Sequence, residues 1–160
     1  MTRLRLLAGV GAALAVMALT AGSAAAGTLT ITVRSVTVSL VRHDTKPKGF
    51  SKGDTIVNRD RLVNAVAQFG RKKGATVGAD RTTTTFTSAD TAVITGTVTL
   101  PGGTLTLGGK LIGLTNGELA VRVVGGSGKY AHAKGMLTVG TEPDNVLNTY
   151  RLVLPSPFAA

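Results

Sequence analysis

Apolar and polar residues alternate along most of this chain, which predicts β-strands rather than helices. In the first such segment Leu29, Ile31 and Val33 alternate with threonines, so one face of the strand would be buried. The apolar positions of residues 36–40 continue the alternation one position out of phase. This slip predicts a β-bulge near residues 34–35, where a long strand can bend.

Turn residues separate the later segments. Pro101-Gly102-Gly103 and Asn116-Gly117 each lie between apolar runs and predict tight hairpins, the second of type I′. We expect a polar loop over residues 43–54, and an irregular stretch with one turn of helix over residues 125–135. The predicted strands cover residues 28–40, 55–69, 76–87, 92–100, 105–111, 119–123, 136–139 and 147–154.

One of these segments, residues 55–69, mixes polar and apolar positions. Ile56 and Leu62 have the same parity as Asp60. A helix over residues 60–69 is one interpretation of this pattern. A strand is favoured, because an inward face of mixed polarity suits a barrel with a lined cavity.

The predicted strands are joined mostly by short turns, and no amphipathic segment is long enough to cover a sheet. Eight antiparallel strands can close on themselves, which removes exposed sheet edges. The interior of such a barrel holds side chains or one small ligand. The fold class predicted is therefore all-β, a closed eight-stranded antiparallel β-barrel formed by one domain over residues 27–160.

The N-terminal residues have the three parts of a secretory signal peptide. Arg3 and Arg5 give a positive start, residues 6–19 are apolar, and Ala24-Ala25-Ala26 supplies small residues for cleavage. The apolar run is shorter than the ~20 residues that a membrane-spanning helix needs. We therefore expect residues 1–26 to be removed, and the rest to be secreted, outside the cell or associated with its envelope, with no membrane span.

Composition narrows the chemistry. The chain has no cysteine, so disulfides, cysteine nucleophiles and cysteine-based zinc sites are excluded. Its net charge of +10 would attract anionic polymers of the cell envelope, whereas export argues against nucleic acid; the alternative is that the charge serves solubility. The early part of the chain carries much of this charge, at Arg34, Arg42, Lys46, Lys48, Lys52, Arg59, Arg61, Arg71, Lys72 and Lys73.

No metal or cofactor is expected. The chain has two histidines, His43 and His132, and a metal site would need further ligands at suitable spacing. Residues 126–131 match the G-x-G-x-x-A pattern of dinucleotide sites, but the next predicted strand begins too early for the required helix. These glycines are better explained as a barrel corner, with Tyr130 closing the barrel end.

Charged residues fall inside one predicted strand, at Arg59, Asp60 and Arg61. If both arginines pointed inward, they would require a partner such as Asp44, Asp80 or a ligand carboxylate, because unpaired buried charge is costly. The alternative places both arginines in solvent and Asp60 inside, and it is favoured because unpaired charges are rarely buried.

Four motifs in order resemble the allene oxide cyclase barrel-like and dirigent-like families, over roughly Val33 to Leu154. They are a loop ending in Gly-Asp (Gly49–Asp54), a Leu-Pro-Gly-Gly hairpin (Leu100–Gly109), a Gly-Gly-x-Gly-x-Tyr-x-x-Ala-x-Gly segment (Gly125–Gly135) and a closing strand (Asn148–Leu152).

The resemblance implies an eight-stranded barrel with a ligand cavity, in many members a homotrimer. Plant allene oxide cyclases close a cyclopentenone ring, and dirigent proteins hold phenoxy radicals for stereoselective coupling. Both confine a reactive molecule in one conformation. Dirigent cavities use Asp, Arg and Tyr, and of these only Asp44 matches, as part of the His-Asp pair that ends a first strand. Together with residues considered above, the candidate ligand-binding residues are Asp44, Arg59, Arg61 and Tyr130. The Cys and Glu environment of the plant cyclases has no counterpart, so no catalytic residue is assigned.

Three functions follow from these patterns. The first is a secreted barrel that binds a small, largely apolar molecule and steers its reaction. The second is a non-catalytic barrel, filled by its own side chains, that adheres to anionic polymers. The third, an isomerase or cyclase, is least favoured because no acid–base set is identifiable. A cavity of ~300 Å³ or more with convergent polar groups would favour ligand binding over the structural role.

Overall fold

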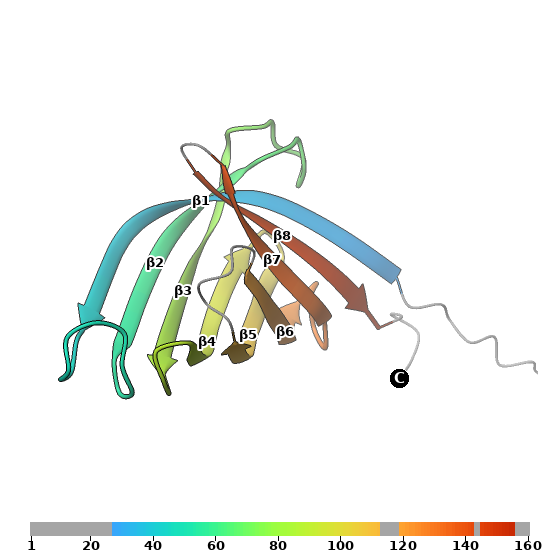
Figure 1. The fold of residues 1–160 in the computed structure, drawn as a ribbon. Coiled ribbons are helices and arrows are strands. Elements are labelled where there is room, and N and C mark those ends of the chain that lie inside the picture. Colours follow the sequence, from blue (N-terminus) through green and yellow to red (C-terminus); the bar gives the residue numbers. More distant parts are fainter. Residues whose placement is uncertain (1–26, 113–118, 143–144, 156–160) are drawn as a thin grey trace, which may run out of the picture.

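The computed structural model describes residues 27–112, 119–142 and 145–155, and all regular structure in these ranges is β-strand (Figure 1). Alternating side chains and short turns produce this result, as the sequence predicts. The strands are β1 (Gly27–His43), β2 (Thr55–Asn64), β3 (Thr76–Phe86), β4 (Thr91–Leu100), β5 (Gly103–Ile112), β6 (Leu119–Gly128), β7 (Lys134–Glu142) and β8 (Asn145–Leu154).

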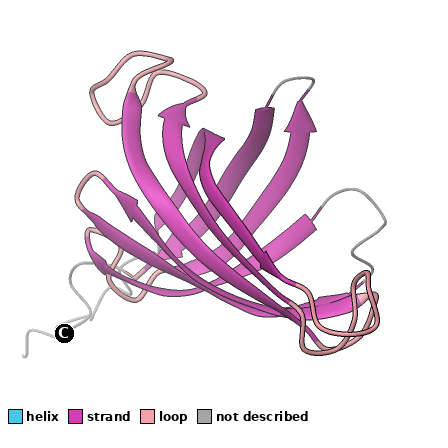
Figure 2. Cartoon of the chain, turned by 90° about the vertical axis from the view of Figure 1, so that its left-hand side faces the viewer, coloured by secondary structure: helices cyan, strands magenta, loops and turns pink. Residues whose placement is uncertain are grey.

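The strands form a closed antiparallel barrel. Each strand pairs with the next one along the chain, and β1 also pairs with β8, so the sheet has no free edge. Figure 2 shows the strongly curved strands, with loops at their ends. The predicted fold class is therefore confirmed.

Long strand β1 bends through a bulge, but not where the sequence predicts it. Its pairing with β2 shifts between Thr37 and Ser39, three residues beyond the predicted slip. Ser35 is buried and continues the inward face of Ile31 and Val33. The apolar pattern misplaced the bulge, because the polar residue Ser35 takes the inward position that follows Val33.

Segment 55–69 is a strand only as far as Asn64, and the alternative helix over residues 60–69 is wrong. Beyond Asn64 the chain forms a loop that is held by side-chain amides. The Asn64 Nδ2 donates to the carbonyls of Gln68 at 3.0 Å and Arg71 at 3.2 Å, while Gln68 Nε2 donates to the Thr32 carbonyl at 2.6 Å. Buried Asn64 therefore organises this loop rather than lining a site.

Segment 125–135 is more regular than predicted. Strand β6 continues to Gly128, and Lys129 to His132 form turns instead of a turn of helix. Amides of Tyr130 and Ala133 donate to the carbonyls three residues earlier, at 3.0 Å each. Buried Tyr130 closes this end of the barrel as expected, and its hydroxyl donates to the Pro101 carbonyl at 3.1 Å.

Packing inside the barrel is uneven along its axis. The end that Tyr130 closes is filled by apolar side chains that pack against one another. The opposite end, where the β1–β2 and β3–β4 loops lie, contains the cavity described below. The filled end is formed by Ile31, Val33, Leu62, Val77, Val98, Leu100, Leu105, Val123, Tyr130, Ala133 and Leu152.

Two sequence-based predictions concern residues that the structure does not describe. The predicted signal peptide, residues 1–26, and the predicted Asn116-Gly117 turn lie outside the described residues. In the part of the chain that the structure describes, no helix has the length and apolar character needed to cross a membrane.

Candidate functional site

The lumen contains a cavity of about 330 Å³ in the half of the barrel opposite Tyr130. Every strand contributes to its wall, because alternate residues of each strand point inward. Most of the wall is aliphatic, from Leu40, Ile56, Ile94, Leu107, Leu119, Val121, Leu137, Val139 and Val146; the polar lining residues are Ser35, Thr37, Asn58, Asp60, Asp80, Thr82, Thr84 and Asn148.

Two carboxyl groups lie next to each other in this wall. Asp60 on β2 and Asp80 on β3 are direct cross-strand partners, so their side chains leave neighbouring strands on the same face. Each is only 8% exposed. Asn58 Nδ2 donates to Asp60 Oδ2 at 2.9 Å and orients that carboxylate. The pair thus projects into the cavity from the barrel wall.

Burial perturbs these acids. Loss of hydration, and after it the negative charge of Asp60, raises the pKa of Asp80 from 3.8 to about 7. Near neutral pH Asp80 is therefore about half protonated, and it can donate or accept a proton without a large change in pH. An acid–base pair exists in the lumen that the sequence alone did not reveal.

Tyr150 on β8 completes the polar layer. It is fully buried, and burial together with the charges of Asp80 and Asp60 raises the pKa of its phenol far above the usual range. The phenol is therefore neutral and can donate a hydrogen bond. Near it Asn148, 5% exposed, donates through Nδ2 to Ser35 Oγ at 2.8 Å.

Several polar atoms of this layer are buried without a partner. Such atoms are rare in folded proteins, because a missing hydrogen bond costs about 1–3 kcal/mol. Their clustering beside one cavity indicates a place for a polar group of a ligand. In the part of the chain described here they are Asn58 Oδ1, Asp60 Oδ1, Asp80 Oδ1, Asn148 Oδ1 and Tyr150 Oη, all near the cavity, with Asn64 Oδ1 at the other end of β2.

The β1–β2 loop at the cavity end is built around Asp54, whose carboxylate is buried. Thr45 donates to Asp54 Oδ1 from its hydroxyl at 2.7 Å and from its amide at 2.6 Å, and the Ser51 amide donates to Oδ2 at 2.8 Å. These bonds, the Thr45 hydroxyl first, lower the pKa of Asp54 to about 2. The Gly-Asp of the family motif is therefore a structural element of the loop.

Replacing Asp54 with asparagine should destabilise the protein at pH 7 and reduce its acid sensitivity. A lowered folded-state pKa gives stability that is present above the unfolded value of 3.8 and lost as pH falls toward about 2. Urea unfolding at pH 7 and pH 2.5 measures this. Asp90→Asn, at an exposed position in the β3–β4 turn, is the control. Equal pH dependence in both variants would contradict the assignment.

Aromatic stacking fixes the same loop against β3. The rings of Phe50 and Phe86 stack with centroids 4.7 Å apart, and the Arg42 guanidinium lies 4.3 Å from the Phe50 centroid. Backbone bonds of 2.9 Å join Gly53 to Phe86 and Phe86 to Asp54. The loop is therefore anchored beside the cavity end of the barrel.

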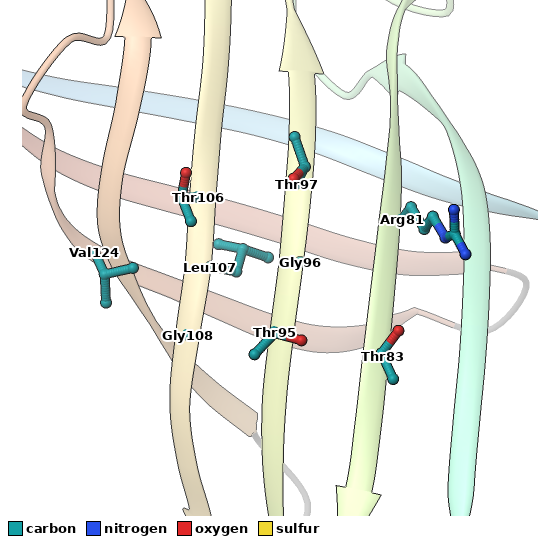
Figure 3. Close-up of a pocket in the computed structure, with 9 residues that line it drawn as sticks. All are labelled: Arg81, Thr83, Thr95, Gly96, Thr97, Thr106, Leu107, Gly108 and Val124. Carbon is teal, nitrogen blue, oxygen red and sulfur yellow. The ribbon is translucent and has the colours of Figure 1, made fainter.

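A second hollow, of about 520 Å³, lies on the outer wall over β3 to β6 (Figure 3). Figure 3 shows threonine side chains and Arg81 around it, with glycines between them. The polar side chains that line it are partly or fully exposed, and among the described residues no unpartnered buried atom belongs to its lining. The lumen is the better candidate site. The outer hollow is lined by Arg81, Thr83, Thr95, Gly96, Thr97, Thr106, Leu107, Gly108 and Val124.

None of the candidate residues from the sequence lines the lumen cavity. Arg59 and Arg61 are exposed on the outer face, which is the favoured alternative, while Asp60 points inward. Asp44 lies in the β1–β2 loop, where its carboxylate is 3.4 Å from Arg42. Tyr130 is at the closed end. The structure does not bring these four residues together, and the charged side chains that line the cavity are the acids Asp60 and Asp80.

The residues that do meet in the lumen are Asp60, Asp80, Asn148 and Tyr150. A weak signal for Asp60 was its parity with Leu62. Asp80 gave a similar signal, since it has the same parity as Thr82 and Thr84, which also line the cavity. Nothing in the sequence showed that Asp60 and Asp80 are paired, because that depends on the register of β2 with β3.

Comparisons with known proteins agree with this architecture. The family model described as Dirigent-like protein matches residues 26–154. A search of curated proteins gave no match. Among solved structures, a pyocyanin demethylase is similar with a TM-score of 0.64 and 25% identity, over 78% of this chain and 99% of that chain.

Two further structures share the fold at lower identity. The pterocarpan synthase dirigent protein GePTS1 has a TM-score of 0.61 and 15% identity, over 82% of this chain and 91% of its own. The Diels–Alderase AbmU from Streptomyces koyangensis has a TM-score of 0.58 and 18% identity, over 86% of this chain and 73% of its own.

Proposed function

Because the chain belongs to the dirigent-like protein family, we propose that it binds a small, largely apolar molecule in its lumen and steers the reaction of that molecule. The observation that carries this proposal is the cavity of about 330 Å³, with aliphatic walls and a buried polar layer on one side. Its volume lies within the range of small-molecule sites. On this proposal the protein acts after export, as residues 1–26 predict.

Confinement is the mechanism that the geometry supports best. The aliphatic walls would hold the body of the ligand, while Asp60, Asp80 and Tyr150 would orient its polar group. Fixing a reactive molecule in one conformation removes much of the entropic part of a barrier. Proton transfer by the carboxyl pair would add to this effect, so a cyclase or isomerase activity is no longer disfavoured for want of an acid–base set.

The relatives in this fold support a role in small-molecule chemistry. The similar structures carry the names of a demethylase, a pterocarpan synthase and Diels–Alderases. The reactions differ, whereas the barrel is common to all of them. A shared cavity with variable lining is consistent with such diversity.

A second candidate function rests on the outer surface. Arg59 on β2 is the cross-strand partner of Arg81 on β3, and Arg61 is exposed on the same face as Arg59. These three cations form an outward-facing basic patch that would attract anionic envelope polymers. Salt-sensitive retention on heparin, lost in the Arg59→Ser/Arg81→Ser variant, would support this role.

Saturable binding of naphthalene-sized probes tests the lumen proposal. We expect at least one of two probes, 1-ethylnaphthalene and 1-naphthylmethylamine, to bind the wild-type protein. Val139→Trp, in the cavity wall, should weaken this binding at least tenfold by filling the cavity. Val93→Trp, at an exposed outer position of β4, should leave it unchanged.

Two results would overturn the lumen proposal. One is that neither probe binds, and the other is that both tryptophan variants weaken binding equally. Native mass spectrometry of protein from its own host complements the assay, because it reports a co-purifying ligand and the number of subunits.

A further inference from the structure

We propose that the lumen is built for a cationic ligand, an organic ammonium whose positive nitrogen lies against Asp60 and Asp80. This inference rests on the proposed function, and it specifies the chemical class of the ligand. The apolar part of the molecule would occupy the aliphatic wall, and the nitrogen would meet the polar layer.

The unpartnered atoms of the polar layer are nearly all acceptors. Asn58 Oδ1, Asp60 Oδ1, Asp80 Oδ1 and Asn148 Oδ1 are buried oxygens without a hydrogen-bond donor. The side chains of Asp60, Asp80 and Asn148 are each more than nine-tenths buried and line the cavity. A ligand that satisfies them must bring donors, and an ammonium group brings three.

The distribution of charge also favours a cationic ligand. The protein as a whole is basic, with a net charge of +10, yet no lysine or arginine is among the described residues that line the cavity. Arg59 and Arg61, the neighbours of Asp60 in sequence, point away to solvent. Within the part of the chain that the structure describes, the carboxyl pair therefore has no counter-ion in the cavity, and a buried carboxylate pair without one is strongly destabilised. A bound cation would supply the missing charge.

The aliphatic wall favours an organic cation over a metal ion. Calcium takes six to eight oxygen ligands and magnesium keeps several waters, whereas this cavity offers two carboxylates on one side, amide and hydroxyl oxygens beside them, and leucine, isoleucine and valine side chains over most of its wall. An amine with an apolar body matches both parts of the lining. Metal binding is kept as a competing outcome of the test.

Binding of the cation is coupled to a proton. Burial and the charge of Asp60 raise the pKa of Asp80 to about 7, so in the free protein Asp80 is largely protonated below neutral pH. A nearby ammonium favours the ionised carboxylate, and the proton leaves Asp80 for solvent. An alkylammonium keeps its own charge in this range, as lysine does. Tyr150, the other titratable side chain of this cluster, stays neutral.

The experiment compares two probes of the same shape and different charge. In 1-naphthylmethylammonium an ammonium group replaces the terminal methyl group of 1-ethylnaphthalene. We expect the ammonium to bind the wild-type protein at least tenfold more tightly at pH 8. Its affinity should rise about tenfold between pH 6 and pH 8, since below the pKa each pH unit changes the ionised fraction tenfold. The affinity for 1-ethylnaphthalene should change little.

Matched variants test whether Asp60 and Asp80 cause the preference for the ammonium. In Asp60→Asn/Asp80→Asn the preference for the ammonium should disappear, while binding of 1-ethylnaphthalene persists. Asp90→Asn removes one negative charge at an exposed site and should leave the preference intact. Should the double variant not fold, carbon-13 NMR of the wild-type protein replaces it: saturating ammonium should lower the pKa of the Asp80 carboxyl by at least one unit.

Failure of this inference differs from failure of the proposed function. Equal affinity for both probes would overturn the cation inference and leave lumen binding intact. Binding of neither probe would overturn both. Displacement of the ammonium by micromolar calcium would assign the carboxyl pair to a metal and overturn the inference as well.

Discussion

Replacing Gly126 with alanine should lower the free energy of unfolding by about 3 kcal/mol, since a side chain there meets backbone on two sides. A β-carbon at this position would lie 2.5 Å from the Thr104 carbonyl oxygen and would also overlap the Tyr130 carbonyl oxygen. Both neighbours are held in place. Thr104 pairs with Ser127 in the β5–β6 ladder, and the Tyr130 amide is bonded to the Ser127 carbonyl at 3.0 Å.

The adjacent glycine provides a matched control. A β-carbon at Gly125 would find nothing within 4 Å, and its backbone does not require a positive φ. Gly125→Ala should therefore change the stability by no more than about 0.5 kcal/mol. Urea unfolding of both variants decides the point. If the two substitutions have equal effects, close packing at this corner is not the reason for the second glycine of the motif.

Much of the barrel could be predicted because its physical signals are local. Strand β4 was predicted from alternation that puts four apolar residues on one face. All four side chains are buried: Ala92, Ile94, Val98 and Leu100. The Pro101-Gly102-Gly103 hairpin followed from turn chemistry, with Gly102 at a φ of +97°. Strands of this kind in antiparallel order have few ways to hide their edges, so closure was also predictable.

The errors arose where a polar residue replaced an apolar one for reasons outside the local pattern. Ser35 holds an inward position of β1 because it accepts a hydrogen bond from Asn148 on the neighbouring strand β8. Asn64 is buried because it satisfies carbonyls of the loop that follows it. Hydrophobic periodicity treats Ser35 as an interruption of the alternation, which displaced the predicted bulge. It gives no sign that β2 ends at Asn64, so the second strand was predicted too long.

The candidate site was missed for a related reason. Asp60 and Asp80 become a pair only through the β2–β3 register, and that register depends on the loop over residues 65–75. Contacts of Gln68 with Thr32 on β1 help to fix this loop. Such long-range contacts cannot be read from composition or spacing. Resemblance to the family directed attention to Asp44 instead, which the structure places outside the lumen.

Replacing Asp80 with asparagine should stabilise the protein at pH 8 by up to about 4 kcal/mol, with little effect at pH 4. The pKa of Asp80 is raised from 3.8 to about 7 in the folded state. A raised carboxyl pKa means that the folded protein binds the proton more tightly. Its stabilising effect is complete below about pH 4 and is lost as pH rises through about 7. Asparagine has the same shape and no charge, so it avoids this loss.

The partner substitution separates the two causes of the raised pKa. In Asp60→Asn the neighbouring negative charge is gone, so the pKa of Asp80 should fall. Carbon-13 NMR of the Asp80 carboxyl measures this change. The pKa should remain above 3.8, because burial is the larger cause and is unchanged. A return to 3.8 would make the charge of Asp60 the whole effect. An Asp80 carboxyl that titrates near 3.8 in the wild-type protein would mean that water solvates the pair, and the stabilisation by Asp80→Asn would then vanish as well.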